Sequence, residues 1–283
     1  MKKLLIFILA LAALPLNAQD LLNKRHGFNI GLEISSYKYQ EPGDHAISHT
    51  GAFSGVWAEY IFKGKSAWAE PEAPFTYFLA AEGSFLTGTV DYDGWLYDSG
   101  TDTYTKYDVS GVGDYFAELR LKAGALIQAG EKWQIQPYAG LAARYLEDAM
   151  ERRSPYGYNR TDLYLYIPLG AKARLSLPRS WALTFGGELD WLLLGKQNSR
   201  MSDINPGYNN LTFDQTGGYG ARLSARVDKS FKRVGIFFEP FFRYWNIKES
   251  DPAVLTLNGV FDGMYVEPEN TTTEWGIRTG VFF

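Results

Sequence analysis

Charged residues occupy every second position through much of the chain, and they are the side chains best placed to do chemistry. Between Glu118 and Lys122, acidic and basic side chains alternate with leucines, which puts the charges on one face of a β-strand. The same parity on other segments collects Glu33, Glu59, Glu82, Glu118, Arg120, Lys122, Arg144, Lys172, Arg174, Glu188, Asp190, Arg222, Arg226, Asp228, Glu239, Arg243, Glu274 and Arg278. These are nine charges of each sign. Because an ion-selective wall would favour one sign, the balance predicts mutual pairing rather than a pore lining.

The three histidines are poorly placed for catalysis. His26 falls at the start of the first expected strand, and His45 and His49 lie with Asp44 in the connection that follows it. The chain has no Gly-x-Ser-x-Gly motif. It also has no Cys, which excludes a disulfide framework, a thiol nucleophile and a Cys-ligated metal. We therefore expect no enzymatic activity, no catalytic, metal-binding or cofactor-binding residue, and no cofactor.

An acidic segment, residues 91–114, is the second candidate for chemistry. It is expected to be a long loop, and it holds Asp91, Asp93, Asp98, Asp102, Asp108 and Asp114 against the single Lys106. Clustered carboxylates could bind Ca²⁺, but the spacing lacks the glycine and glutamate of an EF-hand loop, so a solvated acidic loop is favoured. The aromatic residues Tyr92, Trp95, Tyr97, Tyr104 and Tyr107 leave a partner or glycan surface open as an alternative.

The elements that would position these side chains are strands. Ten stretches alternate with period two, at residues 27–39, 52–62, 75–90, 115–128, 133–145, 163–175, 181–191, 219–228, 234–244 and 273–283. Short connections (63–74, 129–132, 178–180 and 229–233) alternate with long ones (40–50, 91–114, 147–160, 194–217 and 246–271). Short turns at one end and long loops at the other are typical of outer-membrane barrels, and no residues are left over for a second domain.

The apolar faces of the same strands predict contact with lipid. No segment has about 18 consecutive apolar residues, so a transmembrane helix is excluded, whereas barrel strands escape hydropathy windows. Aromatic residues on the apolar faces form two groups. The group at the short-turn ends is Trp133, Trp181 and Phe283, and the group toward the long-loop ends is Tyr115, Tyr145, Trp191, Tyr219, Tyr244 and Trp275. Two such belts are expected at membrane interfaces. Glycines share the charged faces, which suits a narrow lumen better than the surface of a soluble β-sandwich or lipocalin-like barrel.

The first residues have the pattern of a secretory signal peptide. Lys2 and Lys3 precede an apolar run over residues 4–16, and Asn17-Ala18 supplies small residues for cleavage. We expect residues 1–18 to be removed and residues 19–283 to form the barrel. Loss of the two lysines changes the formal charge from -4 to -6. An acidic mature chain argues against a nucleic-acid partner.

The last strand supplies a resemblance. Trp275, Ile277, Val281 and the terminal Phe283 share one parity, and such a strand resembles the final strand of bacterial outer-membrane β-barrels, where it acts as the assembly signal. Segments 137–146 and 164–170 also look like a pattern in uncharacterised Gram-negative barrel proteins. The resemblance implies the barrel-assembly machinery and outer-membrane lipid as partners. Omptin proteases are similar in architecture, but their activity needs paired Asp residues and a His at the outer mouth, and the Asp–His arrangement on a late strand is missing here.

Taken together, these patterns predict an all-β protein, a ten-stranded antiparallel transmembrane β-barrel with an up-and-down meander, in the outer membrane of a Gram-negative bacterium. The leading functional hypothesis is a structural or surface-interaction barrel with a charge-plugged lumen and long external loops that could hold a surface ligand. A narrow passive channel for small solutes and an omptin-like hydrolase are the alternatives.

Overall fold

The computed structural model describes residues 25–65, 76–98 and 100–283. The signal peptide and its cleavage site therefore lie outside the described residues, as does most of the connection expected at 63–74. No helix among the described residues is long and apolar enough to cross a membrane.

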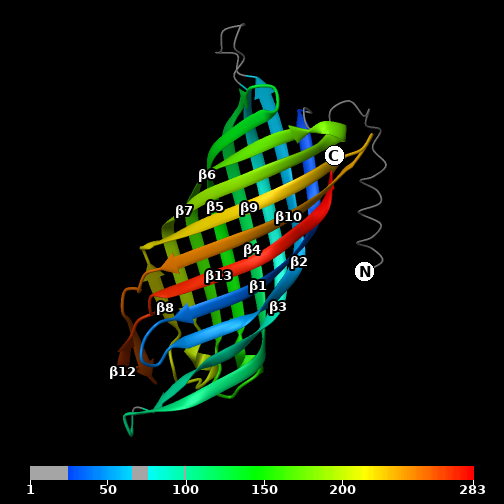
Figure 1. Cartoon of the computed structure of the whole chain (residues 1–283). Helices are drawn as coiled ribbons and strands as arrows, with labels where there is room; N and C mark the ends of the chain where they lie inside the picture. Colours follow the sequence, from blue (N-terminus) through cyan, green and yellow to red (C-terminus); the bar gives the residue numbers. More distant parts are fainter. Residues whose placement is uncertain (1–24, 66–75, 99) are drawn as a thin grey trace.

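Ten strands form the wall of a closed antiparallel barrel, which confirms the predicted fold (Figure 1). They are β1 (His26–Glu41), β2 (Ile47–Lys65), β3 (Thr76–Asp98), β4 (Thr103–Ala129), β5 (Trp133–Ala149), β6 (Asn159–Leu177), β7 (Trp181–Ser199), β9 (Gly218–Ser230), β10 (Gly235–Ile247) and β13 (Asn270–Phe282). Each strand pairs with the next one of this set, and β1 pairs with β13 to close the barrel.

The remaining elements are short and lie outside this wall. Strand β8 (Leu211–Gln215) pairs with the outer end of β7, and β11 (Ala253–Leu257) forms a hairpin with β12 (Val260–Tyr265). Three single-turn 3₁₀ helices, η1 (Met150–Arg152), η2 (Pro178–Ser180) and η3 (Met201–Asp203), occupy connections. We call the end that holds the start of β1 and the end of β13 the periplasmic end, and the opposite end, with β8 and β12, the outer end (Figure 1).

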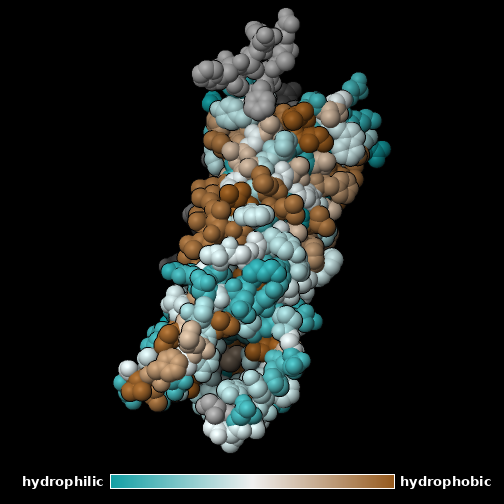
Figure 2. Space-filling view, turned by 90° about the vertical axis from the view of Figure 1, so that its left-hand side faces the viewer, coloured by the Kyte–Doolittle hydropathy of each residue, from teal (hydrophilic) through white to brown (hydrophobic). Residues whose placement is uncertain are grey.

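Exposed apolar side chains gather in a belt across the face of the barrel in Figure 2, in its half nearer the periplasmic end. Leu32, Leu189 and Leu223 are each 59–65% exposed, and they share the outward parity of their strands. Because burying a leucine side chain is worth about 1.5–3 kcal/mol, a row of leucines left facing outward requires lipid rather than water around it. The charged parity faces inward, so the barrel has the inside-out polarity of a transmembrane barrel.

The nine aromatic residues expected at the membrane interfaces all face outward. Six are more than one-third exposed, namely Trp133, Trp181, Tyr115, Trp191, Tyr219 and Trp275. Tyr145, Tyr244 and Phe283 are partly exposed on the same surface. Their contact with the membrane interfaces stays a prediction.

The predicted bounds of the long loops need correction, because residues at one or both ends of each loop continue the barrel strands. The clearest case is segment 91–114, where β3 extends to Asp98 and β4 begins at Thr103. Beyond the belt the outward residues become polar, such as Thr87 and Thr89, and the inward residues become apolar, such as Val90 and Val112, which are 1% and 0% exposed. The strand period persists, but the apolar face changes from outside to inside. Because the sequence prediction followed only the outward apolar face, it ended these strands too early.

Closure of the barrel depends on a close approach between β1 and β13. Gly280 lies opposite Gly31 on β1, and a Cβ atom at Gly280 would overlap the backbone carbonyl of Ile30. We expect Gly280→Ala to lower the free energy of unfolding by about 1–3 kcal/mol, as overpacking does in other tightly packed sites. Thermal unfolding in detergent micelles, followed by circular dichroism, measures the change. Gly113→Ala is the matched control, since no atom lies within 4 Å of its Cβ position. Equal melting curves for the two variants would contradict the proposed role of Gly280 in the close contact between β1 and β13.

Candidate functional site

The lumen holds all eighteen charged residues that the sequence analysis assigned to the inward parity. Each of them forms at least one ion pair of 4.0 Å or less with another member of the set. Many are almost completely buried: Glu33 is 0% exposed and Asp190 is 1% exposed. We call this set the lumen charge network. An unpaired charge in such surroundings would cost several kcal/mol, so the pairing is a condition of the fold.

Arg222 on β9 is one centre of the network. Its guanidinium group lies 2.5 Å from Glu118, 2.7 Å from Asp190 and 3.3 Å from Glu188. The Tyr166 hydroxyl accepts a hydrogen bond from Arg222 and donates one of 2.7 Å to Glu118. Removal of this one arginine would leave two buried carboxylates, Glu118 and Asp190, without their main counter-charge.

A second centre joins the two sides of the β1–β13 seam. Glu33 on β1 accepts hydrogen bonds of 2.6 Å from both Arg243 and Arg278. Arg278 also lies 3.2 Å from Glu82 on β3, and Arg243 lies 3.0 Å from Glu274. These contacts connect strands at the beginning and the end of the chain through charge as well as through the backbone ladder.

Several uncharged residues complete the network and were not singled out from the sequence. The Trp57 indole N–H donates to Glu82 at 2.8 Å, the Tyr138 hydroxyl donates to Glu188 at 2.7 Å, and Asn29 donates to Glu59 at 3.1 Å. All three share the inward parity of their strands, so extending the parity rule from charged to polar and aromatic residues would have found them.

Apolar side chains cover the network on the side of the outer end. One buried cluster contains Tyr37, Tyr39, Phe53, Leu86, Val90, Val109, Val112, Phe116, Leu146 and Met150, and a second contains Ala142, Tyr166, Leu192, Trp245 and Ile247. We call these two clusters together the apolar layer. Arg144 touches both the network and this layer, because its guanidinium lies 3.1 Å from Glu274 and 4.8 Å from the centre of the Phe116 ring.

A second polar cluster begins among the outer residues of the apolar layer, in segments that the sequence analysis placed in loops. Asp114 and Asp148 face each other across β4 and β5, and His49 lies 3.4 Å from Asp148. Burial, together with the nearby Asp148 carboxylate, raises the pKa of Asp114 to about 9. Burial lowers the pKa of His49 well below its ordinary value, so its contact with Asp148 is made by a neutral imidazole.

Arg160 supplies the positive charge of this outer cluster. It lies 3.3 Å from Glu267 and 3.6 Å from Glu41, and its guanidinium stacks over the Tyr39 ring at 5.0 Å. Burial raises the pKa of Glu267 to about 8, although Arg160 opposes the shift. A neutral Glu267 at physiological pH keeps the cluster from accumulating negative charge around one arginine.

The histidines do not come together. His49 is enclosed by the rings of Tyr39 and Tyr92, whose centres lie 5.3 and 5.1 Å away. His45 stacks on Tyr104 at the outer tip, and His26 hydrogen-bonds the Tyr60 hydroxyl at the periplasmic end. An Asp–His pair buried behind aromatic rings cannot reach an external substrate.

The acidic segment does not gather its carboxylates around one point. Asp93 and Asp108 both lie beside Lys106, and Asp91 accepts a hydrogen bond from the backbone of Gly111 at 2.9 Å. Among the described residues, no group of three acidic or histidine side chains is arranged to hold a metal ion. The geometry therefore gives no support to the Ca²⁺ alternative.

The raised pKa of Asp114 predicts a pH-dependent stability. Between about pH 4 and pH 9 the folded protein retains a proton that the unfolded chain releases, so the free energy of unfolding falls as pH rises through this range. Thermal unfolding from pH 5 to pH 9 should show a falling midpoint. In Asp114→Asn the fall should be smaller, because the amide resembles the protonated acid. Asp93→Asn, an exposed carboxylate on the same hairpin, is the control. Parallel curves for all three proteins would refute this role of Asp114.

Comparison with solved structures finds a similar fold in one known barrel. The outer membrane protease OmpT from Escherichia coli matches with a TM-score of 0.61 and 10% identity, covering 96% of this chain and 99% of its own. A FadL homologue from Pseudomonas aeruginosa (8% identity, TM-score 0.28) and an outer membrane channel from Pseudomonas putida F1 (12% identity, TM-score 0.31) each match over 96% of this chain, and over 95% and 97% of their own. No protein-family model and no curated protein matches the chain. The likeness to OmpT concerns the fold alone, and with the apolar exterior and charged interior it confirms the prediction of an outer-membrane β-barrel.

Proposed function

We propose that this protein is a non-conducting outer-membrane barrel whose work is done at its outer end. The observation that carries the proposal is the apolar layer above the lumen charge network. Phe116, Leu86 and Val112 are 0–2% exposed, and their side chains fill much of the lumen at that level. Apolar constrictions stop ion flow by excluding water, so this layer would keep the lumen closed to ions.

The charges below the layer also argue against conduction. A lumen that selects ions presents one sign of charge with free coordination sites, whereas here each carboxylate is occupied by arginine or lysine. The passive-channel alternative would require breaking these pairs, and the hydrolase alternative would require an accessible Asp–His pair. Among the described residues, neither alternative finds the feature that it would require.

Opening the apolar layer by mutation tests the closed-barrel proposal. In planar bilayers we expect no discrete conductance steps from the wild-type protein. The double variant Leu86→Ala/Phe116→Ala removes the centre of the layer, so it should admit water and give measurable steps. Phe85→Ala is the matched control, since Phe85 is 52% exposed on the lipid face of the same strand. Steady steps from the wild-type protein would overturn the proposal, and so would silence from a correctly folded double variant.

The β11–β12 hairpin is the element that we propose for interaction at the outer surface. One of its faces packs on β8, where Leu255 joins Leu211 and Phe213 in a buried cluster. Elsewhere on the hairpin, Val260, Phe261 and Met264 are 70%, 65% and 61% exposed. Apolar residues gather again near the lower end of Figure 2, across a polar zone from the belt. Contiguous exposed apolar groups in water are typical of interaction sites, and aromatic residues with methionine are typical of protein interfaces. We therefore propose that this hairpin contacts a partner protein.

Site-specific photo-crosslinking in intact cells tests the hairpin. A benzophenone side chain in place of Phe261 should yield one adduct of discrete mass with a protein, because the residue would lie within the contact. The same probe in place of Phe85, which faces lipid, should give no protein adduct. The absence of a protein adduct at Phe261, or the same adduct at both positions, would reject the hairpin as the contact element.

The other proposed partners follow from the membrane location. Outer-membrane lipid would contact the exposed apolar belt, and the barrel-assembly machinery would engage β13. Support for the second comes from the position of β13, which pairs with β1 at the closing seam and carries the exposed Trp275 and Ile277.

A further inference from the structure

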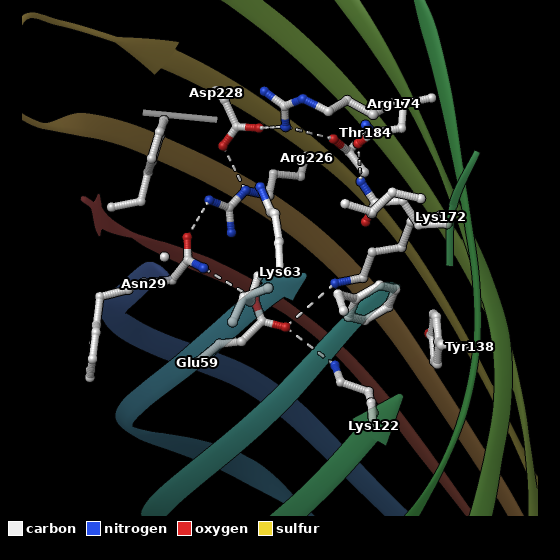
Figure 3. Close-up of a pocket in the computed structure, with 18 of the residues that line it drawn as sticks. Asn29, Glu59, Lys63, Lys122, Tyr138, Lys172, Arg174, Thr184, Arg226 and Asp228 are labelled. Carbon is white, nitrogen blue, oxygen red and sulfur yellow. Dashed lines mark hydrogen bonds and ion pairs between the residues drawn. The ribbon is translucent and has the colours of Figure 1, made fainter. Parts of the chain in front are cut away.

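A pocket at the periplasmic end of the lumen carries more positive than negative charge (Figure 3). It has a volume of about 120 Å³, and Gly27 and Phe283 lie on its rim. Among the described residues that line it, the charged side chains are Lys63, Lys122, Lys172, Arg174, Arg226, Glu59 and Asp228. Five cations thus share one small space with two carboxylates.

Each of the two carboxylates serves two cations. Asp228 lies 2.9 Å from Arg174 and 2.7 Å from Arg226. Glu59 lies 3.3 Å from Lys122 and 3.7 Å from Lys172. Counted over the side chains that line the pocket, this sharing leaves an excess of positive charge.

Two of the cations have capacity left for a further acceptor. The Nη2 atom of Arg174 is buried and has no hydrogen-bond partner in the structure. The distance of 3.7 Å between Lys172 and Glu59 exceeds a hydrogen bond, and the Lys172 side chain is 33% exposed. Both residues lie on β6 with inward parity, and Figure 3 shows their side chains bordering the same space.

The positive excess is local to this end of the lumen. Of the nine carboxylates in the lumen charge network, only Glu59 and Asp228 line the pocket, whereas four of the nine cations do. Two of the other seven carboxylates also reach cations of the pocket from deeper in the barrel: Glu82 lies 2.6 Å from Lys122, and Glu239 lies 3.6 Å from Arg226. The positive excess is therefore confined to the side chains that line the pocket, and it rests on Lys172 and Arg174.

We propose that this pocket binds a phosphate-type oxyanion that enters from the periplasmic end. Guanidinium and ammonium groups are the side chains that recognise phosphate oxygens, and a guanidinium can donate two parallel hydrogen bonds. A cavity needs about 10–15 Å³ of this kind of volume to hold one water molecule. The pocket, at about 120 Å³, therefore has room for several waters or for one phosphate group. The anion would accept a hydrogen bond from Arg174 Nη2 and pair with Lys172. This site is independent of the closed-barrel proposal, because it needs access from one end only.

Calorimetric titration with inorganic phosphate tests the site. The full-length barrel, refolded in a phosphate-free maltoside detergent, should bind one phosphate per chain with saturation. Lys172→Met and Arg174→Met should each raise the dissociation constant about tenfold or more, since each removes a charged donor. Lys132→Met is the matched control, because Lys132 is an exposed lysine in a turn at the same end that does not line the pocket. Circular dichroism establishes that each variant is folded.

Competition with a phospholipid distinguishes a lipid headgroup from a free phosphate as the bound anion. If phosphatidylglycerol added to the micelles competes with inorganic phosphate, a lipid headgroup is the occupant, and if it does not, a free phosphate or phosphate ester is. The proposal fails if the wild-type protein shows no saturable binding, or if Lys172→Met and Arg174→Met bind phosphate as tightly as Lys132→Met does.

Discussion

Each buried charge in the lumen needs a counter-charge that another strand supplies, and the rest of the structure depends on this condition. Several of the pairs cross the lumen between strands that are not neighbours, as in Arg144 on β5 with Glu274 on β13 and Arg222 on β9 with Glu118 on β4. A sheet that is only partly closed would leave such arginines unpaired in a poorly solvated space, at a cost of several kcal/mol each. Closure of the wall and assembly of the network therefore form one cooperative step, and the apolar layer can pack only on the closed wall.

The lumen is organised in levels with different chemistry. Cations dominate at the periplasmic pocket, a carboxylate-rich network follows, the apolar layer separates it from the outer end, and a final cluster gathers Asp114, Asp148 and Glu267 around Arg160. The apolar layer separates most members of these two polar regions. This separation suits a barrel that isolates its two ends from each other.

Strand parity was sufficient to predict the ten strands, the closed meander and the inward orientation of the network. It could not predict which charges pair, because pairs that cross the lumen, such as Arg120 with Glu188, depend on the stagger of the closed barrel. It also missed the outer halves of the strands. Near Ser35 and Ser36 the apolar face of β1 moves from outside, at Ile34, to inside, at Tyr37. The alternation of apolar and polar residues continues along the strand, but the apolar face switches from the outside to the inside. A prediction that follows only the lipid-facing apolar residues therefore ends the strand too early.

That inversion also sets the depth at which the barrel sits in the membrane. Along each strand a step of two residues covers about 6–7 Å, and a shift of that size would bring Ser36 and Lys38 into hydrocarbon or expose Ile34 to water. The wall therefore resists vertical displacement in both directions. Its outer half stands at a constant height above the lipid, and the β11–β12 hairpin is held by a rigid stem at a fixed distance from the membrane surface.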